Sequence, residues 1–227
     1  MKKLACMQPY FFPYIGYFQL INYVDVFVSH DDGNYIKNHW INRNSIESSR
    51  GERVRFTVPV RKASHKLKIH EVLIDSDSFF FWKSKFLKTL EQNYGKQPNF
   101  NLVMDMVSSV LDSDLNSISE LSLKSIREVS SLLEIKTEII PSSRRYEYSG
   151  ETVLNKIKIM CESEKSFCYV NPVGGKDFYS RSRFMEMSLN LEFMKSSSEF
   201  SFSIIDTLMR TSLEEVREKL MNYEIVL

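Results

Sequence analysis

Residues 3–29 read KLACMQPYFFPYIGYFQLINYVDVFVS, and this stretch decides the fold class. The apolar run at residues 3–7 predicts a buried strand that ends at the following Gln-Pro pair. Pro13 suits the first turn of a helix, and apolar side chains then recur through residue 21 at the spacing of one helix face. Residues 24–29 are β-branched and aromatic and predict a second strand. Strand, helix and strand form a βαβ unit, so we expect these two strands to be parallel.

The rest of the 227-residue chain continues the alternation of strand-like and helix-like segments. Further strands are predicted at residues 53–60, 72–74, 135–140, 167–171 and 191–194, and shorter helices at residues 152–162, 177–189 and 213–221. A helix-rich stretch at about residues 79–134 interrupts this pattern. We therefore expect one domain over residues 1–227, an α/β fold with a three-layer, mostly parallel Rossmann-like sheet and a helical insertion.

The composition excludes several classes of protein. No run of eighteen apolar residues occurs, so no membrane insertion is expected, and prolines and tyrosines break the N-terminal apolar segment where a signal peptide would be smooth. The three cysteines are widely separated and the four histidines lack the spacing of zinc ligands. We therefore expect no metal, reduced thiols and a cytoplasmic location, with Cys6 and Cys168 acting as small apolar residues in buried strands.

Charge is distributed unevenly along the chain. The whole sequence has 30 Lys+Arg and 29 Asp+Glu, a net charge of +1. Residues 37–68 contain nine basic and two acidic side chains, so this segment is 9 − 2 = +7 and the remainder is 1 − 7 = −6. A localised basic segment predicts a cleft for a phosphorylated substrate, although a solvated basic strand would give the same count.

Ligands of open parallel α/β sheets bind beyond the carboxyl ends of the strands, which directs attention to the loops there. The loop after the second strand reads DDGNYIKNHWINRN at residues 31–44. An aspartate there can act as a base, and an arginine can hold a phosphate or carboxylate through two hydrogen bonds. The alternative is a solvated loop whose Asp and Asn side chains cap turns. The candidate catalytic residues are Asp31, Asp32, Lys37, Asn42 and Arg43.

Polar, aromatic and glycine residues in the same set of loops are candidates for substrate binding. Aromatic rings and a glutamine follow the first strand, Ser-Ser-Arg-Arg follows the strand at residues 135–140, and Gly-Gly-Lys follows the strand at residues 167–171. An aromatic core and an ordinary helix cap are the competing interpretations. The candidate substrate-binding residues are Gln8, Tyr10, Tyr14, Gly16, Tyr17, Asn34, Trp40, Asn44, Ser142, Ser143, Asn171, Gly174, Gly175 and Lys176.

Several segments together resemble the WbqC-like family, whose members occur in bacterial polysaccharide and O-antigen biosynthesis clusters. The resemblance is carried by QPYFFPYIGYFQLIN at residues 8–22, DVFVSHD at residues 25–31 and YIKNHWINRN at residues 35–44. It continues through Tyr169-x-Asn171-Pro172-x-Gly174 and Ser203-Ile204-Ile205-Asp206 and covers almost the whole chain. The chain departs from the family pattern at Gly33-Asn34, where Val-Gln is usual, and at Phe86, where histidine is usual.

The resemblance implies a transferase that N-acylates the amine of a nucleotide-linked amino sugar, with an aminoacyl group such as glycyl. ATP or an aminoacyl donor, for example an aminoacyl-tRNA, is the implied co-substrate. The segment around Pro13 also resembles the His-x-Gly-His region of nucleotidylyltransferases, but Pro13 and Tyr17 stand where that region has histidines. Two other hypotheses stay open: a non-catalytic protein that binds nucleotide sugars or scaffolds glycan assembly, and an RNA-binding protein that uses the basic segment.

Overall fold

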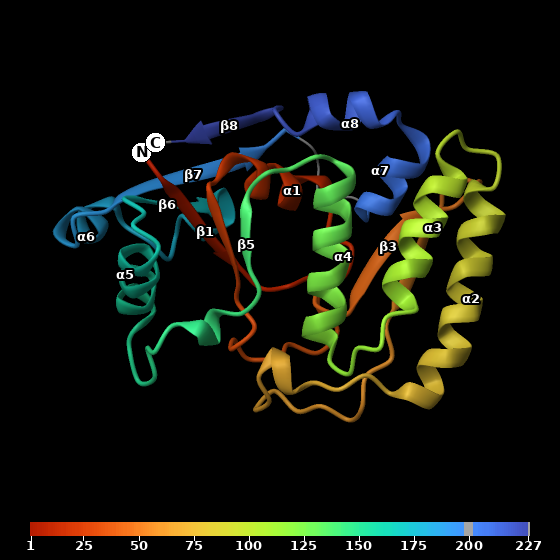
Figure 1. Ribbon diagram of the computed structural model, residues 1–227, viewed down its shortest axis with the longest axis horizontal. Coiled ribbons are helices and arrows are strands. Elements are labelled where there is room, and N and C mark those ends of the chain that lie inside the picture. Colours follow the sequence, from red (N-terminus) through yellow and green to blue (C-terminus); the bar gives the residue numbers. More distant parts are fainter. Residues whose placement is uncertain (198–201, 227) are drawn as a thin grey trace.

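The computed structural model describes residues 1–197 and 202–226 and contains a six-stranded sheet in the order β5-β2-β1-β6-β7-β8 (Figure 1). The first five strands in that order are parallel, and β8 is antiparallel to β7. The strands are β1 Lys3–Met7, β2 Val26–Ser29, β5 Glu138–Ile140, β6 Cys168–Pro172, β7 Asn190–Ser196 and β8 Tyr223–Val226. The expected mostly parallel sheet is confirmed.

The N-terminal βαβ unit forms as the sequence predicts. β1 pairs in parallel with β2, with Leu4 opposite Val26 and Met7 opposite Ser29, and α1 (Ile15–Tyr23) connects them. The second strand begins two residues later than expected, because Val24 caps the C-terminus of α1 through a bond from its amide to Ile21.

Two hydrophobic cores cover the two faces of the sheet. Alternate strand residues such as Ala5 and Phe27 belong to the core that contains α1 and α4 (Ile118–Leu132), whereas Leu4 and Val28 belong to the core that contains α5 (Val153–Ser163) and α6 (Arg181–Glu186). Burial on both faces explains why these strands are continuously apolar. The three-layer α/β architecture is thus confirmed.

The helix-rich stretch between β4 and β5 forms three long helices that pack against one another (Figure 1). They are α2 (Ser76–Tyr94), α3 (Phe100–Leu111) and α4. The remaining helices are α7 (Ile204–Arg210) and α8 (Leu213–Lys219), with short 3-10 turns η1 (Ile69–Glu71), η2 (Ser143–Arg145) and η3 (Val173–Gly175). Within residues 1–197 and 202–226, no helix is long and apolar enough to cross a bilayer.

The basic segment forms a separate antiparallel hairpin, and here the sequence prediction needs correction. Residues 53–60 form the shorter strand β4 (Arg53–Thr57), which pairs with β3 (Arg43–Glu47). The first two residues of β3 were expected to lie in a loop. The polar residues of β3 hide its strand character, although Asn44, Ser45 and Ile46 are all buried. Residues 72–74 make only isolated bridges rather than a strand.

Further differences lie toward the C-terminus. The helix expected at residues 177–189 is shortened to α6, and neither α7 nor β8 was expected. The helix α7 is only 7 residues long, and the strand β8 is only 4 residues long. Segments of this length carry too little periodicity to be recognised without their packing partners.

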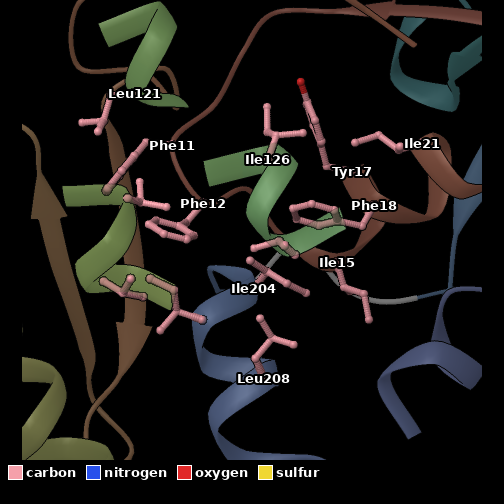
Figure 2. Close-up of a cluster of buried hydrophobic side chains, with 14 of the residues drawn as sticks. Phe11, Phe12, Ile15, Tyr17, Phe18, Ile21, Leu121, Ile126, Ile204 and Leu208 are labelled. Atoms are coloured by element: carbon pink, nitrogen blue, oxygen red, sulfur yellow. The ribbon is translucent and has the colours of Figure 1, made fainter. Parts of the chain in front are cut away.

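Phe12 is the point where the loop after β1 is tied to the rest of the molecule. Its φ of 42° is unusual for a bulky residue, and its side chain is fully buried. Its amide donates to Ser125 Oγ at 3.0 Å, and its carbonyl accepts from Asn44 Nδ2 at 2.7 Å and from Ser203 Oγ at 2.8 Å. Figure 2 shows the surrounding apolar cluster, in which side chains of the Phe11–Ile21 region meet Ile204 and Leu208 of α7. These bonds hold the conformation and place the loop at the carboxyl edge of the sheet.

Candidate functional site

The carboxyl ends of β2 and β5 bring together two pairs of predicted site residues, Asp31-Asp32 and Ser142-Ser143, which are more than a hundred positions apart in the sequence. Because β2 and β5 are parallel neighbours, with Val28 opposite Ile140, the loops that follow them emerge side by side. Ser142 Oγ donates to Asp31 Oδ1 at 2.7 Å across 111 residues of sequence. Ser143 Oγ donates to Asp32 and lies 3.4 Å from Asp31 Oδ1.

Three further polar side chains, not predicted from the sequence as site residues, complete this group. Arg144 Nε lies 3.2 Å from Asp31 Oδ2, and Lys156 Nζ lies 3.7 Å from Asp32 Oδ2. The Tyr148 hydroxyl donates to Asp32 Oδ1 at 3.1 Å. Tyr148 and Lys156 belong to the connection between β5 and β6, and only their position in this connection could have suggested them.

His30 fixes the charge state of Asp32. Its Nδ1 lies 2.9 Å from Asp32 Oδ1, a distance that makes an ion pair although Nδ1 has no well-aligned hydrogen-bond acceptor. Burial opposes the charge on His30, but its interactions with Asp32 and with Cys6 outweigh burial and raise the pKa of His30 to about 10. Burial likewise opposes the charge on Asp32, while His30 and Ser143 hold its pKa well below the usual range. At neutral pH this pair is therefore imidazolium and carboxylate.

A cavity of about 710 Å³ opens beside Asp32. We call it the Asp32 cavity, and it is lined by Asp32, Lys68, His70, Arg144, Tyr146, Glu147, Tyr148, Ser149, Gly150 and Lys156. Three permanently cationic side chains face two carboxylates there, so the lining carries a net positive charge. Asn34 reaches its rim, because Lys68 Nζ donates to Asn34 Oδ1 at 2.8 Å. The His70 ring lies 3.0 Å from the Asp31 carbonyl and supports the same loop.

The other predicted catalytic residues lie on or beside the β3–β4 hairpin and do not line the Asp32 cavity. Asn42 is buried, accepts from the Tyr35 hydroxyl at 3.0 Å and donates to the Val58 carbonyl at 2.9 Å, so its amide links parts of the fold. Lys37 is exposed. Arg43 and Trp40 line a second cavity of about 250 Å³, which we call the hairpin cavity. Its lining is Asn38, His39, Trp40, Arg43, Asn44, Ser45, Arg53 and Arg55.

The predicted residues after β1 are buried or half-buried and pack against one another. Tyr17 is buried and donates to the Gln8 carbonyl at 2.9 Å, and burial raises its pKa well above the ordinary value. A Cβ on Gly16 would collide with the Tyr14 ring, so this glycine allows close packing. The ring centroids of Tyr10 and Tyr17 are 5.8 Å apart. Burial and the nearby Tyr14 raise the pKa of Tyr10 to about 12.

The loop after β6 lies at the same edge of the sheet, because β6 is the neighbour of β1. Asn171 is buried, and its amide donates to the Pro172 carbonyl at 3.2 Å. A Cβ on Gly175 would collide with the Asn171 amide, whereas a Cβ on Gly174 would meet nothing. Lys176 is exposed, and none of these residues lines the Asp32 cavity. Among the described residues, no group of three or more His, Cys, Asp or Glu side chains could hold a metal ion.

Comparison of the sequence with known proteins identifies a matching family. The model of the WbqC-like protein family matches residues 8–218. A protein of Mycobacterium tuberculosis (strain ATCC 25618 / H37Rv), named "Uncharacterized protein Rv1507c", is 31% identical over 194 residues, which cover 84% of this chain and 81% of that protein. No solved structure matches the chain.

Proposed function

The chain belongs to the WbqC-like protein family, and on that premise we propose that it is a transferase of bacterial polysaccharide (O-antigen) precursor synthesis. The proposed reaction is N-acylation of the amine of a nucleotide-linked amino sugar, with an aminoacyl group such as glycyl. The proposed donor is an activated carboxylic acid, formed with ATP or delivered as an aminoacyl-tRNA. We place the reaction in the cytoplasm, a location that suits three cysteines without disulfide bonds.

The Asp32 cavity is the single observation that carries this proposal. Its volume of about 710 Å³ is in the range of small-molecule sites, and it lies beyond the carboxyl ends of parallel strands. Lys68, Arg144 and Lys156 provide positive charge for a diphosphate. Asp32 provides a carboxylate that can hold the sugar amine, so the lining suits a ligand with phosphates at one end and an amine at the other.

The chemistry that we propose needs one proton acceptor beside the amine. The amine nitrogen attacks the acyl carbonyl carbon, a nitrogen–carbon bond forms, and the bond from that carbon to the leaving oxygen breaks with its electron pair going to the oxygen. The nitrogen is cationic after the attack and therefore strongly acidic. The Asp32 carboxylate can accept this proton transiently and pass it to the leaving oxygen, and its lowered pKa makes it a weak base that does not retain the proton.

A second candidate function, non-catalytic binding of a nucleotide sugar, is favoured by the contacts of Asp32. This carboxylate is already engaged by His30, Ser143, Tyr148 and Lys156. A carboxylate held in this way is a weaker base than a free one, and it suits recognition of a fixed ligand.

Incubation of the purified protein with a dTDP-linked 4-amino sugar tests the transferase. One arm contains an amino acid and ATP, and the other contains aminoacyl-tRNA. Mass spectrometry should detect the N-acyl product. No mass shift in either arm, from folded protein, would refute the transferase.

Asp32→Asn separates the two candidate functions, and Asp105→Asn is the matched control. Asp105 is exposed on α3, so its replacement changes the charge equally without affecting the cavity. A transferase should lose far more turnover than sugar affinity in Asp32→Asn, because Lys68, Arg144 and Lys156 still hold the phosphates. A binding protein should show only a change in affinity.

A further inference from the structure

We propose that the ligand site extends from the Asp32 cavity to the switch point of the sheet, where the side-chain amides of Gln8 and Asn171 bind the hydroxyl groups of the amino-sugar ring. The switch point is the boundary between β1 and β6, from which the chain builds the sheet outward in both directions. The sugar assignment rests on the proposed function, which brings the phosphates of the same ligand to the cations of the Asp32 cavity.

The order of the strands puts the switch point one strand away from the Asp32 cavity. On one side of β1 the chain adds β2 and then β5, and on the other side it adds β6, β7 and β8 (Figure 1). The helices divide in the same way, because α1 and α4 cover one face of the sheet and α5 and α6 cover the other. Open α/β sheets bind ligands outside the carboxyl ends of their strands at such a point. We therefore expect a ligand to reach from the cavity beyond β2 and β5 to the ends of β1 and β6.

Polar side chains follow one another along this edge, on the face that α5 and α6 cover. Val28 and Tyr169 pack in the core on that face. Side chains two positions apart share a face of a strand, so His30 and Asn171 lie on this face as well. Neighbouring strands are about 4.8 Å apart, so β6 and β2, with β1 between them, are separated by about 10 Å. This length suits a hexose ring with a hydrogen bond at each end.

Gln8 joins this row at the end of β1, between the other two side chains. Its Nε2 lies 3.4 Å from the position of a Cβ on Gly33, and His30 Nε2 lies 3.1 Å from the same position, so the two side chains are neighbours. The Asn171 amide lies against Gly175 in the same manner, because a Cβ there would collide with it. Each amide therefore occupies space that a glycine in these loops leaves open.

The two amides have hydrogen-bonding groups to offer a ligand. Gln8 is half-buried, and in the part of the chain that the structure describes its side-chain amide has no hydrogen-bond partner. Asn171 is buried and uses Nδ2 to donate to the Pro172 carbonyl, while its Oδ1 accepts no bond from any described residue. Polar groups at such depth are ordinarily paired, so these unpaired groups indicate a ligand.

A sugar ring is the ligand chemistry that these groups fit. An amide both donates and accepts, and so does a hydroxyl, so each amide can exchange hydrogen bonds with the ring in both directions. Neither amide carries a charge, whereas phosphate binds preferentially to cations such as those of the Asp32 cavity. Asp32 joins the two regions, because it lines the cavity and its carboxylate lies 2.9 Å from His30 Nδ1. An amino sugar that binds Asp32 through its amine thus has phosphates on one side and amides on the other.

Titration calorimetry of the whole protein with dTDP and with a dTDP-linked 4-amino sugar tests the proposal, because only the second ligand carries the hexose ring. Gln8→Leu is the principal variant, since it removes the amide and breaks no side-chain hydrogen bond of the described chain. Asn171→Ala is the second variant. Gln92→Leu is the matched control, because Gln92 is exposed on α2. Lys68→Ala, at the phosphate end, should weaken both ligands.

The native protein should bind the dTDP-linked sugar more tightly than dTDP. Gln8→Leu and Asn171→Ala should each weaken binding of the dTDP-linked sugar about tenfold, the loss expected for one hydrogen bond, and leave the binding of dTDP unchanged. Gln92→Leu should bind both ligands normally. Equal weakening of dTDP would place the nucleoside at the amides and overturn the proposal. Equal affinity of the native protein for the two ligands, or unchanged sugar binding in Gln8→Leu, would overturn it as well.

Two results separate this inference from the proposed function. Sugar-dependent binding that both variants weaken, without any acyl product, would overturn the transferase and leave the sugar site in place. Acyl transfer by a protein whose two variants keep native affinity for the sugar would overturn the sugar site and leave the transferase.

Discussion

Replacing Asn42 by alanine tests whether this residue, a catalytic candidate by sequence, is part of the framework instead. Its amide connects the Tyr35 hydroxyl at 3.0 Å with the Val58 carbonyl at 2.9 Å, and 4% of the residue is exposed. Each net hydrogen bond is worth about 1 kcal/mol, and a buried polar group left without a partner costs about 1–3 kcal/mol. We expect Asn42→Ala to lower the free energy of unfolding by about 3 kcal/mol.

A second substitution shows where this energy resides. Tyr35→Phe removes the hydroxyl, which loses its partner in Asn42→Ala. The double variant should therefore be more stable than the sum of the two single changes predicts, by about 1 kcal/mol. This non-additivity distinguishes a lost internal hydrogen bond from a general disturbance of the hairpin.

Urea unfolding at pH 7 measures these differences, provided that the dependence of the free energy on urea is unchanged among the variants. Asn155→Ala is the control, because this amide is exposed on α5 and should change stability by less than about 0.5 kcal/mol. An Asn42→Ala protein of native stability that has lost turnover would refute the reasoning and return Asn42 to the catalytic site.

Two further substitutions test the site and its neighbouring loop. Asp32→Asn should lower the pKa of His30 from about 10 toward its ordinary 6.5, as followed by NMR titration, and a pKa that stays near 10 would contradict the ion pair. A raised histidine pKa stabilises the fold fully below pH 6.5, and this stabilisation is lost as the pH rises through about 10. The stability advantage of the native protein over Asp32→Asn, about 1 kcal/mol for a partly exposed pair, should therefore shrink between pH 7 and pH 10. Gly175→Ala should lower the free energy of unfolding by about 1–3 kcal/mol, measured by thermal or urea unfolding, because the new Cβ collides with Asn171. Gly174→Ala should leave stability unchanged, and Asn171→Ala should relieve the collision in Gly175→Ala. Equal effects at the two glycines would count against this packing.

The candidate site contains some residues that sequence patterns predict and others that they do not. The loop rule for parallel sheets selected Asp31, Asp32, Ser142 and Ser143, and these residues do meet. His30 was not selected, because a lone histidine at the end of a strand carries no signal of its partner. Its ion pair with Asp32 exists only in the folded chain.

The sequence by itself determined the βαβ beginning, the three-layer class and the set of loops that could hold a site. Those features follow from local apolar periodicity and from turn residues, which the chain displays without any tertiary contact. Family membership is likewise determined by the sequence alone, because the motifs at residues 8–44 are short contiguous segments.

Tertiary structure alone decided which polar residues are functional candidates and which hold the fold. Residues 42–44 are all polar, yet Asn42 and Asn44 are buried and bond to backbone and hydroxyl groups, whereas Arg43 is half-buried and lines a cavity. The physical reason is that a strand turns alternate side chains to opposite faces, and only pairing with β4 and packing against the loop at Phe12 decide which face is buried.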